Sequence, residues 1–159
     1  MILNRYIVEE LFAKCNHRVL YGYGDKPALD ADSSTISRAD CSGFTRWVVY
    51  RASGVTIPEG SVEQHAWAQA NLKSVPFVEA RNDQTNRMFQ CFIVPSDVND
   101  NIGHTYFLQN GSSFECCGGE QYSPIYDKDV DGVMSRVIAD TPVLLNETSV
   151  SFEWPSIAA

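Results

Sequence analysis

The sequence has no apolar run that approaches the roughly 20 residues a membrane-spanning helix requires. It also has little positive charge and no cluster of Lys and Arg. Twelve Lys and Arg stand against 20 Asp and Glu, for a net charge of −8, which argues against a nucleic-acid-binding surface. Internal repeats and low-complexity tracts are missing too. We therefore expect neither a membrane span nor a nucleic-acid partner.

The N-terminus lacks the uninterrupted apolar core of a secretory signal, because Arg5, Glu9 and Glu10 break the stretch from Met1 to Lys14. We expect no signal peptide here. Three interpretations then remain open: a cytoplasmic protein, export by a route that needs no cleaved signal, and a processed form of a longer chain. The sequence does not choose the localisation among them.

Complete metal-binding signatures are also missing. No Cys-x-x-Cys pair at zinc spacing is present, and the adjacent Cys116 and Cys117 are expected to be core residues or weak metal ligands. The opening of a calcium loop is matched by Asp127, Asp129, Asp131 and Gly132, but the twelfth position counted from Asp127 holds Ile138 instead of a bidentate Glu. The five cysteines are an odd number, so at least one is a free thiol. We expect no metal and no cofactor.

Composition and hydrophobic periodicity predict one α+β domain over residues 1–159. A 44% hydrophobic content at this length is typical of a single globular core. Apolar residues at helical spacing predict helices over residues 2–14, from Cys41 to near Gly54, and over residues 61–72. At the start of the last helix, Ser61 and Gln64 have the form of a capping box.

The second half of the chain is rich in aromatic and β-branched residues, which predicts strands. The expected strands cover residues 88–95, 104–109, 112–117, 133–138 and 143–154. Asn110-Gly111 predicts a hairpin between the second and third of them. Because helices precede strands without βαβ alternation, we expect the N-terminal helices to pack on one antiparallel sheet.

Cys41 is the candidate nucleophile, because it stands at the start of a predicted helix. A helix N-terminus lowers the pKa of a thiol through its dipole and its free backbone N–H groups. The same N–H groups can stabilise the oxyanion that forms when a carbonyl is attacked. The small neighbours Ser42 and Gly43 are expected to leave room for a substrate.

His104 is the candidate base. Of the three histidines, it alone begins a predicted strand, in a sheet that can face the helix of Cys41. His17 and His65 lie within or at the ends of helical patterns, so we expect them to be surface or structural residues.

A third polar group is expected to orient the imidazole, and the predicted hairpin brings residues 112–117 beside His104. Alternation places Glu115 and Cys117 on one face of that strand. Glu115 is the stronger candidate, because a carboxylate accepts the imidazole N–H and stabilises the imidazolium. Cys117 is the alternative third catalytic residue, and an exposed position without a catalytic role is the other interpretation of Glu115.

Four segments follow one another around these residues. They are residues 20–24 (Leu-Tyr-Gly-Tyr-Gly), 40–44 (Asp-Cys-Ser-Gly-Phe), 57–64 (Ile-Pro-Glu-Gly-Ser-Val-Glu-Gln) and the pair Gly103-His104. Their order and composition resemble the NlpC-type cell-wall peptidases, a papain-like superfamily. The resemblance covers the chain from Tyr21 to about Gly119.

The resemblance implies a single papain-like catalytic domain, with helices packed on an antiparallel sheet and the nucleophile at a helix N-terminus. It further implies a cysteine peptidase or amidase that hydrolyses amide bonds in peptidoglycan stem peptides, commonly between D-glutamate and a diamino acid. Small secreted toxin amidases of interbacterial competition share this core. Any immunity or delivery protein for this chain stays unknown.

Residue by residue, the resemblance makes Cys41 the nucleophile and His104 the base. It places Tyr21, Asp40 and Ser42 near the substrate amine or the reacting carbonyl, as substrate-binding residues. From helix chemistry alone, Asp40 and Ser42 are equally explained as residues of a first helical turn.

The chain also departs from the family pattern. The family's third residue is usually His, Asn or Gln, where this sequence offers Glu115 or Cys117. Glu59 replaces a common Arg and Tyr23 replaces Trp, so the bond cleaved stays open.

Two other functions fit the same sequence. One is a catalytically inactive papain-like module that binds wall peptides or a protein partner. An active enzyme requires the Cys41 sulfur beside a ring nitrogen of His104 in an open cleft, whereas the binding module permits a blocked or misaligned pair. The other is a papain-like peptidase or acyltransferase that uses the same residues on a substrate outside the cell wall.

Overall fold

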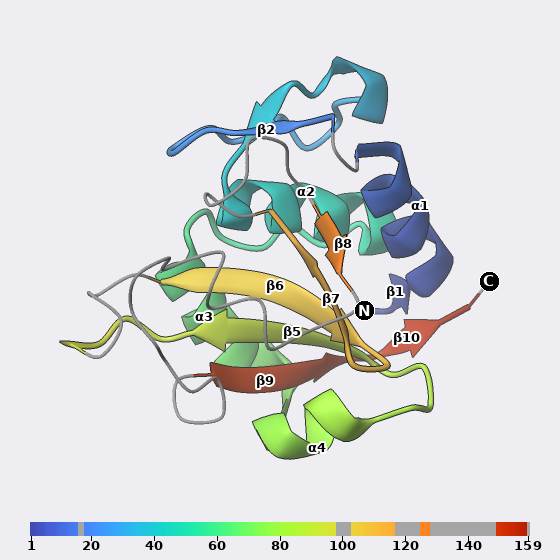
Figure 1. The fold of residues 1–159 in the computed structure, drawn as a ribbon, viewed down its shortest axis with the longest axis vertical. Coiled ribbons are helices and arrows are strands. Elements are labelled where there is room, and N and C mark those ends of the chain that lie inside the picture. The colour runs from blue at the N-terminus through green and yellow to red at the C-terminus, as the bar shows by residue number, and fades with distance from the viewer. Residues whose placement is uncertain (16–17, 98–102, 117–124, 128–148, 159) are drawn as a thin grey trace.

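Helices dominate the first half of the chain, and most of the main sheet comes from the second half, as predicted (Figure 1). The computed structural model describes residues 1–15, 18–97, 103–116, 125–127 and 149–158. Its helices are α1 (Arg5–Cys15), the short 3₁₀ turn η1 (Ser33–Thr35), α2 (Cys41–Ser53), α3 (Ser61–Asn71) and α4 (Phe77–Asn82). No helix in this described part of the chain has the length and apolar character needed to span a bilayer.

Within the described residues the main sheet has six strands, in the spatial order β4-β9-β5-β6-β7-β8, and every neighbouring pair is antiparallel. Its strands are β4 (Lys73–Val75), β5 (Met88–Ile93), β6 (His104–Gln109), β7 (Ser112–Glu115), β8 (Ile125–Asp127) and β9 (Ser149–Trp154). The α+β class with an antiparallel sheet is thus confirmed. The strand expected over residues 133–138 lies outside the described residues.

The part of the chain that the structure describes also has two short parallel strand pairs. β1 (Leu3–Asn4) pairs with β10 (Ser156–Ile157), which brings the two ends of the chain together, and β2 (Leu20–Tyr21) pairs with β3 (Arg38–Ala39). The predicted start of the first helix at residue 2 was therefore wrong. Leu3 and Asn4 extend to pair with β10, and Ile2 stays half exposed outside the helix.

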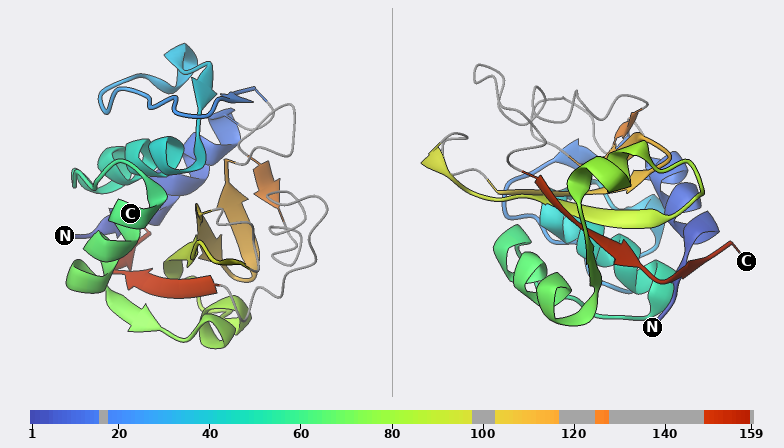
Figure 2. Two further views of the ribbon diagram at one scale, coloured as in Figure 1. Left: turned by 90° about the vertical axis from the view of Figure 1, so that its left-hand side faces the viewer. Right: turned by 90° about the horizontal axis from the view of Figure 1, so that it is seen from below.

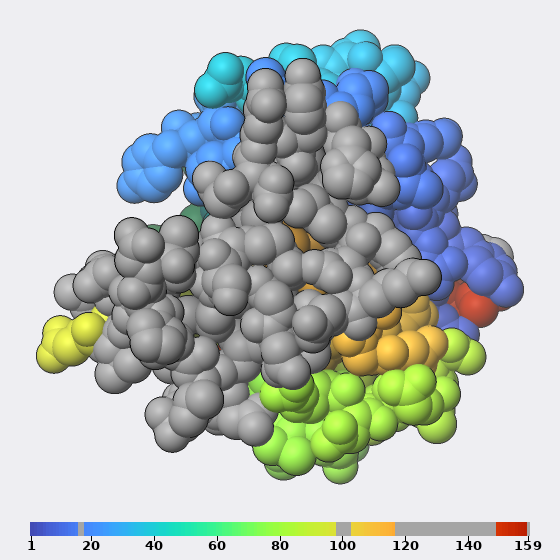
Figure 3. Space-filling model, viewed as in Figure 1, coloured from blue at the N-terminus to red at the C-terminus, as the bar shows by residue number. Residues whose placement is uncertain are grey.

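The sheet is covered on both faces. The core on one face joins α1 and α2 to Met88, Phe107 and Trp154, and the core on the other joins Phe77 of α4 to Phe89 and further residues of β5 and β6. Alternate residues of β5 thus point to opposite faces, as the pleat of a strand requires. Figure 2 turns the sheet to show its layers, and in the space-filling view α4 lies along the lower edge while N-terminal segments form the upper edge (Figure 3).

Among the described helices, α2 has the largest share of buried residues. Phe44, Trp47 and Val48 are fully buried, and the Phe44 ring packs edge-on against Phe12 of α1 at 5.1 Å between centroids. Each such side chain stabilises the fold by about 1.5–3 kcal/mol when it leaves water. This packing fixes the start of α2 beside β6.

The hairpin between β6 and β7 forms at Asn110 and Gly111, as predicted. Both residues have positive φ, 51° and 76°, which is the combination that a type I′ turn requires and that Asn and Gly tolerate. Phe107 pairs with Phe114 across it. The turn therefore sets the register that brings the end of β7 to the start of β6.

The predicted capping box at α3 was wrong. Gly60 is the N-cap residue, with no side-chain capping bond, and Ser61 is the first helical residue. The Gln64 side chain is fully buried and donates to the carbonyls of Ser42 and Pro58 instead of folding back on its own helix. The Gln64 side chain therefore bonds to carbonyl groups outside its own helix instead of to the backbone of the capping residue.

Candidate active site

Cys41 is the first residue of α2, as predicted. Asp40 caps the helix, since its Oδ1 accepts a hydrogen bond of 2.6 Å from the backbone N–H of Gly43. The backbone N–H groups of Cys41 and Ser42 stand in the first turn, where a helix offers no acceptor of its own. The thiol is mostly buried, and it opens into the main cleft.

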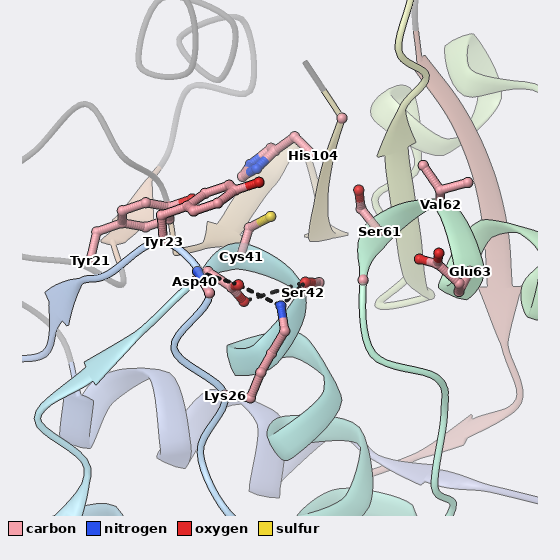
Figure 4. A pocket seen from close by; sticks show the side chains of 13 residues that line it. Tyr21, Tyr23, Lys26, Asp40, Cys41, Ser42, Ser61, Val62, Glu63 and His104 are labelled. Carbon is pink, nitrogen blue, oxygen red and sulfur yellow. Dashed lines mark hydrogen bonds and ion pairs between the residues drawn. The ribbon is translucent and has the colours of Figure 1, made fainter. Parts of the chain in front are cut away.

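His104 is the first residue of β6, and its ring lies against Cys41. Its Nε2 lies 3.3 Å from Oε1 of Glu115, and the ring also hydrogen-bonds the Cys41 side chain. Because Nε2 faces Glu115, Nδ1 is the nitrogen left for the sulfur. Figure 4 shows the Cys41 sulfur directed toward the imidazole. The structure thus brings together the two residues on which the sequence interpretation depends.

The two groups shift each other's titration. Burial opposes the Cys41 thiolate, but the hydrogen bond and charge of His104, helped by the backbone N–H of Thr105, bring the pKa of the thiol below its ordinary value. Burial likewise opposes the imidazolium, yet hydrogen bonds with Cys41 and Glu115 raise the pKa of His104 to about 9. Both shifts favour a thiolate–imidazolium pair over the neutral thiol and imidazole.

Glu115 is the third member of this arrangement. Its side chain is buried at the end of β7, so the interpretation of Glu115 as an exposed strand residue was wrong. Oε1 faces His104, and Oε2 accepts a hydrogen bond of 3.3 Å from the hydroxyl of Ser113. The His104 ring also stacks on Tyr106, 5.8 Å between centroids. Cys117, the alternative third residue, lies outside the described residues.

Asp40 has a second partner that the sequence did not reveal. The ammonium group of Lys26 pairs with its Oδ2 and lies 2.9 Å from the Ser42 hydroxyl, as the dashed lines in Figure 4 show. Gly24 donates a backbone N–H to the same carboxylate. A lysine in a polar loop gives no signal of such a contact, because lysines in loops are usually solvated.

The space beside the Cα of Gly43 is filled by protein, whereas Ser42, the other small neighbour of Cys41, lines the cleft. A methyl group on the Cα of Gly43 would lie 2.8 Å from Asp40 Oδ1, 2.9 Å from the Asp25 carbonyl oxygen and 3.0 Å from the Lys26 side chain. The space beside Gly43 is filled by the loop that carries Lys26. The glycine is needed so that this loop can approach the helix.

The cleft above Cys41 has a volume of about 660 Å³. On one side it is lined by Tyr21, Tyr23 and Lys26, and on the other by Ser61 to Glu63 at the start of α3 (Figure 4). Tyr21 is half-buried, and burial together with the nearby Cys41 and Asp40 charges raises the pKa of its hydroxyl, which stays protonated. Tyr23 is 94% exposed at the rim. The three predicted substrate-binding residues, Tyr21, Asp40 and Ser42, all line this cleft.

The remaining candidates take structural places. His65 of α3 stacks on Phe92 at 5.2 Å, as expected of a structural histidine, while His17 lies outside the described residues. Cys116 is buried, and its thiol donates to the carbonyl of Ala39, as expected of a core cysteine. No group of three potential metal ligands occurs among the described residues. The calcium-like run continues past Asp127 into residues that the structure does not describe.

Comparison with known proteins gives no family assignment: no protein-family model and no curated protein matches this chain.

Proposed function

We propose that this protein is a cysteine peptidase or amidase of papain-like fold that hydrolyses amide bonds in peptidoglycan stem peptides. The observation that carries the proposal is the buried line of Cys41, His104 and Glu115 at the floor of an open cleft. Acyl transfer by a thiol requires a nucleophile, a base and a group that orients the base, with each of them within hydrogen-bonding distance of the next.

The proposed reaction begins with the Cys41 thiolate attacking the amide carbonyl. His104, protonated at Nδ1, then gives that proton to the leaving amine, and water hydrolyses the resulting thioester with His104 as base. Glu115 keeps the other ring nitrogen protonated and stabilises the imidazolium. No step in this sequence needs a metal or an organic cofactor.

The first turn of α2 supplies the electrostatic part of the proposed mechanism. A carbonyl attacked by Cys41 develops negative charge beside the helix N-terminus, where the backbone N–H of Cys41 is available to donate. Tyr21 adds a protonated hydroxyl at the edge of the same cleft. Both donors belong to residues that line the cleft in which the carbonyl would be held.

The substrate class rests on the resemblance to NlpC-type peptidases, and the cleft is compatible with it. Its volume falls within the range of sites that hold small molecules or short peptide segments. The scissile bond proposed is that between D-glutamate and a diamino acid. Because Lys26 already pairs with Asp40, a substrate amine would have to compete with Lys26 for that carboxylate.

The arrangement of Cys41 and His104 supports the enzyme over the inactive binding module. A module that only binds wall peptides needs neither a lowered thiol pKa nor an oriented imidazole, and this protein has both. An acyltransferase or peptidase acting on a substrate outside the wall would use the same residues. Assays with different substrates are therefore needed to distinguish such an enzyme from a wall peptidase.

The test is release of free amines from purified peptidoglycan and from defined stem peptides, with mass spectrometry of the products. Wild-type protein is compared with Cys41→Ala. Cleavage by wild type that is lost in the variant supports the proposal and identifies the bond. Wild-type protein that cleaves neither wall nor peptides, and whose Cys41 does not react with thiol reagents in the folded state, would refute it in favour of the binding module.

A further inference from the structure

Two buried glutamines connect the start of α2 to the central strands of the sheet. The Nε2 of Gln64 donates to the carbonyl of Ser42 at 2.9 Å and to that of Pro58 at 3.0 Å. Its Oε1 accepts a hydrogen bond of 3.1 Å from Nε2 of Gln90. Both side chains are fully buried. The first glutamine thus ties the second residue of α2 to strand β5.

The connection continues from β5 to β6. The same Nε2 of Gln90 also donates to the hydroxyl of Thr105 at 3.2 Å, and its Oε1 accepts the indole N–H of Trp154 at 3.1 Å. The Thr105 hydroxyl in turn donates to the carbonyl of Cys91 at 3.0 Å. Every donor and acceptor group of the two amides is engaged. We call Gln64, Gln90 and the Thr105 hydroxyl the amide network.

Each end of the amide network contacts a residue that is adjacent in sequence to one of the two reacting residues. Ser42 follows Cys41 on α2, and Thr105 follows His104 on β6. The backbone N–H of Thr105 also donates to the Cys41 sulfur. The network therefore joins the backbone that carries the nucleophile to the backbone that carries the base.

Hydrogen bonds give this connection a directionality that apolar packing lacks. Gln90 lies between Met88 and Phe92 on the face of β5 that packs toward α2 and α3. At such a position an apolar side chain could pack in the hydrophobic core without needing a hydrogen-bond partner. A buried amide there requires each partner at one distance and angle, because an unpaired polar group in the core costs about 1–3 kcal/mol. The network therefore resists sliding of α2 along the sheet.

We propose that Gln64, Gln90 and the Thr105 hydroxyl are positioning residues that hold the Cys41 sulfur against His104. Their side-chain hydrogen bonds join groups other than the Cys41 sulfur and the His104 ring, and they act through the backbone of Ser42 and Thr105. The inference rests on the proposed function, since the alignment matters only if Cys41 and His104 react together.

The test compares four substitutions of similar volume. Gln64→Met and Gln90→Met remove the amides, Thr105→Val removes only the hydroxyl, and Gln109→Met is the control. Gln109 is another buried glutamine, at the far end of β6 from His104, where its Nε2 donates to the carbonyl of Asn86. Thr105→Ser, which keeps the hydroxyl, is the rescue variant.

Two quantities are measured for each folded variant. The first is the pH dependence of alkylation of Cys41 by iodoacetamide, with peptide mass spectrometry to confirm the site, and the second is kcat/KM for peptidoglycan cleavage. Thermal unfolding is recorded beside them. The alkylation profile reports the contact of Cys41 with His104 and needs no substrate.

We expect Gln64→Met and Gln90→Met to move the midpoint of alkylation to higher pH and to lower kcat/KM by about 10- to 100-fold, since small displacements of reacting groups have effects of that size. Thr105→Val should shift in the same direction by less, and Thr105→Ser should keep the wild-type profile. Gln109→Met should unfold at a lower temperature and keep the wild-type alkylation profile.

An alkylation midpoint unchanged from wild type in folded Gln64→Met and Gln90→Met would overturn the inference. If those variants do not fold, equal profiles for Thr105→Val and Thr105→Ser would overturn it, and a shift in Thr105→Val alone would support it. The proposed function fails separately, when wild-type protein cleaves no wall substrate. The alkylation comparison still decides the positioning role in that case.

Discussion

His104 Nε2 lies 3.3 Å from Glu115 Oε1, with both side chains withdrawn from solvent at the ends of adjacent antiparallel strands. This contact decides which ring nitrogen faces Cys41. It also places a carboxylate beside the imidazole. A carboxylate both accepts the N–H and stabilises the protonated ring, so it combines orientation with charge.

Glu115→Gln should reduce kcat/KM by about 10- to 100-fold, within the range that general acid–base catalysis contributes. An amide keeps the volume but loses the charge. It can also present its N–H₂ to Nε2, which favours the tautomer that carries its proton on Nδ1 and so cannot accept the proton of Cys41. Kinetics on a defined stem peptide measure the loss. Ser113→Ala, which removes only the hydroxyl bonded to the far oxygen of Glu115, is the matched milder change, and equal kinetics for Glu115→Gln and wild type would contradict the role of the charge.

Activity should decline above about pH 9. The active form needs a Cys41 thiolate and a His104 imidazolium, and the pKa of His104 is raised to about 9, so the imidazolium loses its proton as pH rises through that value. The pKa of Cys41 is lowered, which favours the thiolate and moves the acid limb below the ordinary range of thiols. The pH profile of kcat/KM measures both limbs. In Glu115→Gln the alkaline limb should move to lower pH, and a limb that stays in place would show that Glu115 does not support the imidazolium.

His104→Ala should be nearly as damaging as Cys41→Ala. The base activates the thiol and protonates the leaving amine. When two residues act as one unit, removing either of them lowers the rate almost as much as removing both. Steady-state rates of amine release for the two single variants and the double variant measure this. Additive losses in the double variant would indicate that the two residues act independently.

Asp40→Ala should lower the free energy of unfolding by about 1–2 kcal/mol, the usual effect of losing an N-cap side chain. It removes the acceptor of the Gly43 N–H and the partner of the partly buried Lys26. Asp40→Asn should cost less, because the amide oxygen can still cap the helix. Urea denaturation of both variants measures the difference. Equal losses in the free energy of unfolding would mean that the capping hydrogen bond contributes nothing beyond the negative charge of Asp40.

Gly54→Ala should destabilise the protein by about 1–2 kcal/mol without touching the site. Gly54 ends α2 at a φ of 75°, a left-handed conformation that costs a residue with a Cβ about that much. No atom lies within 4 Å of the added Cβ, so the effect comes from the backbone alone. Gly54→Asn should cost less, because Asn tolerates this conformation. Thermal unfolding compares the two, and identical midpoints would refute the backbone explanation.

Elements controlled by neighbouring residues were predicted well. Asp40 and Gly54 mark the two ends of α2, and Asn110 and Gly111 mark the hairpin, because a cap or a turn is decided by side chains within a few residues. The same local signals placed Cys41 at a helix start. They gave no indication of α4, a helix of six residues that is too short for a periodic pattern and depends on packing of Phe77 and Ala80 against the sheet.

Gln64 illustrates where local interpretation fails. The spacing of Ser61 and Gln64 fits a capping box. The side-chain amide of Gln64 nevertheless forms hydrogen bonds with Ser42, 22 residues earlier, and with Gln90, 26 residues later. A capping signal and a buried tertiary contact use the same chemistry, so the sequence cannot tell which acceptor the amide finds.

Local signals in the sequence were sufficient to predict the parts of the candidate site that depend on neighbouring residues: a cysteine at a helix N-terminus, a histidine at the start of a strand, and a hairpin that returns the chain beside it. The packed fold was needed to choose the buried position of Glu115 over an exposed one, and to show that Lys26 pairs with Asp40 and that the amide network joins α2 to the sheet. Caps and turns are governed by the dihedral angles and hydrogen bonds of adjacent residues. The other contacts arise because burial removes water as a partner, so each polar group must bond to whatever the packed helices and strands bring within reach.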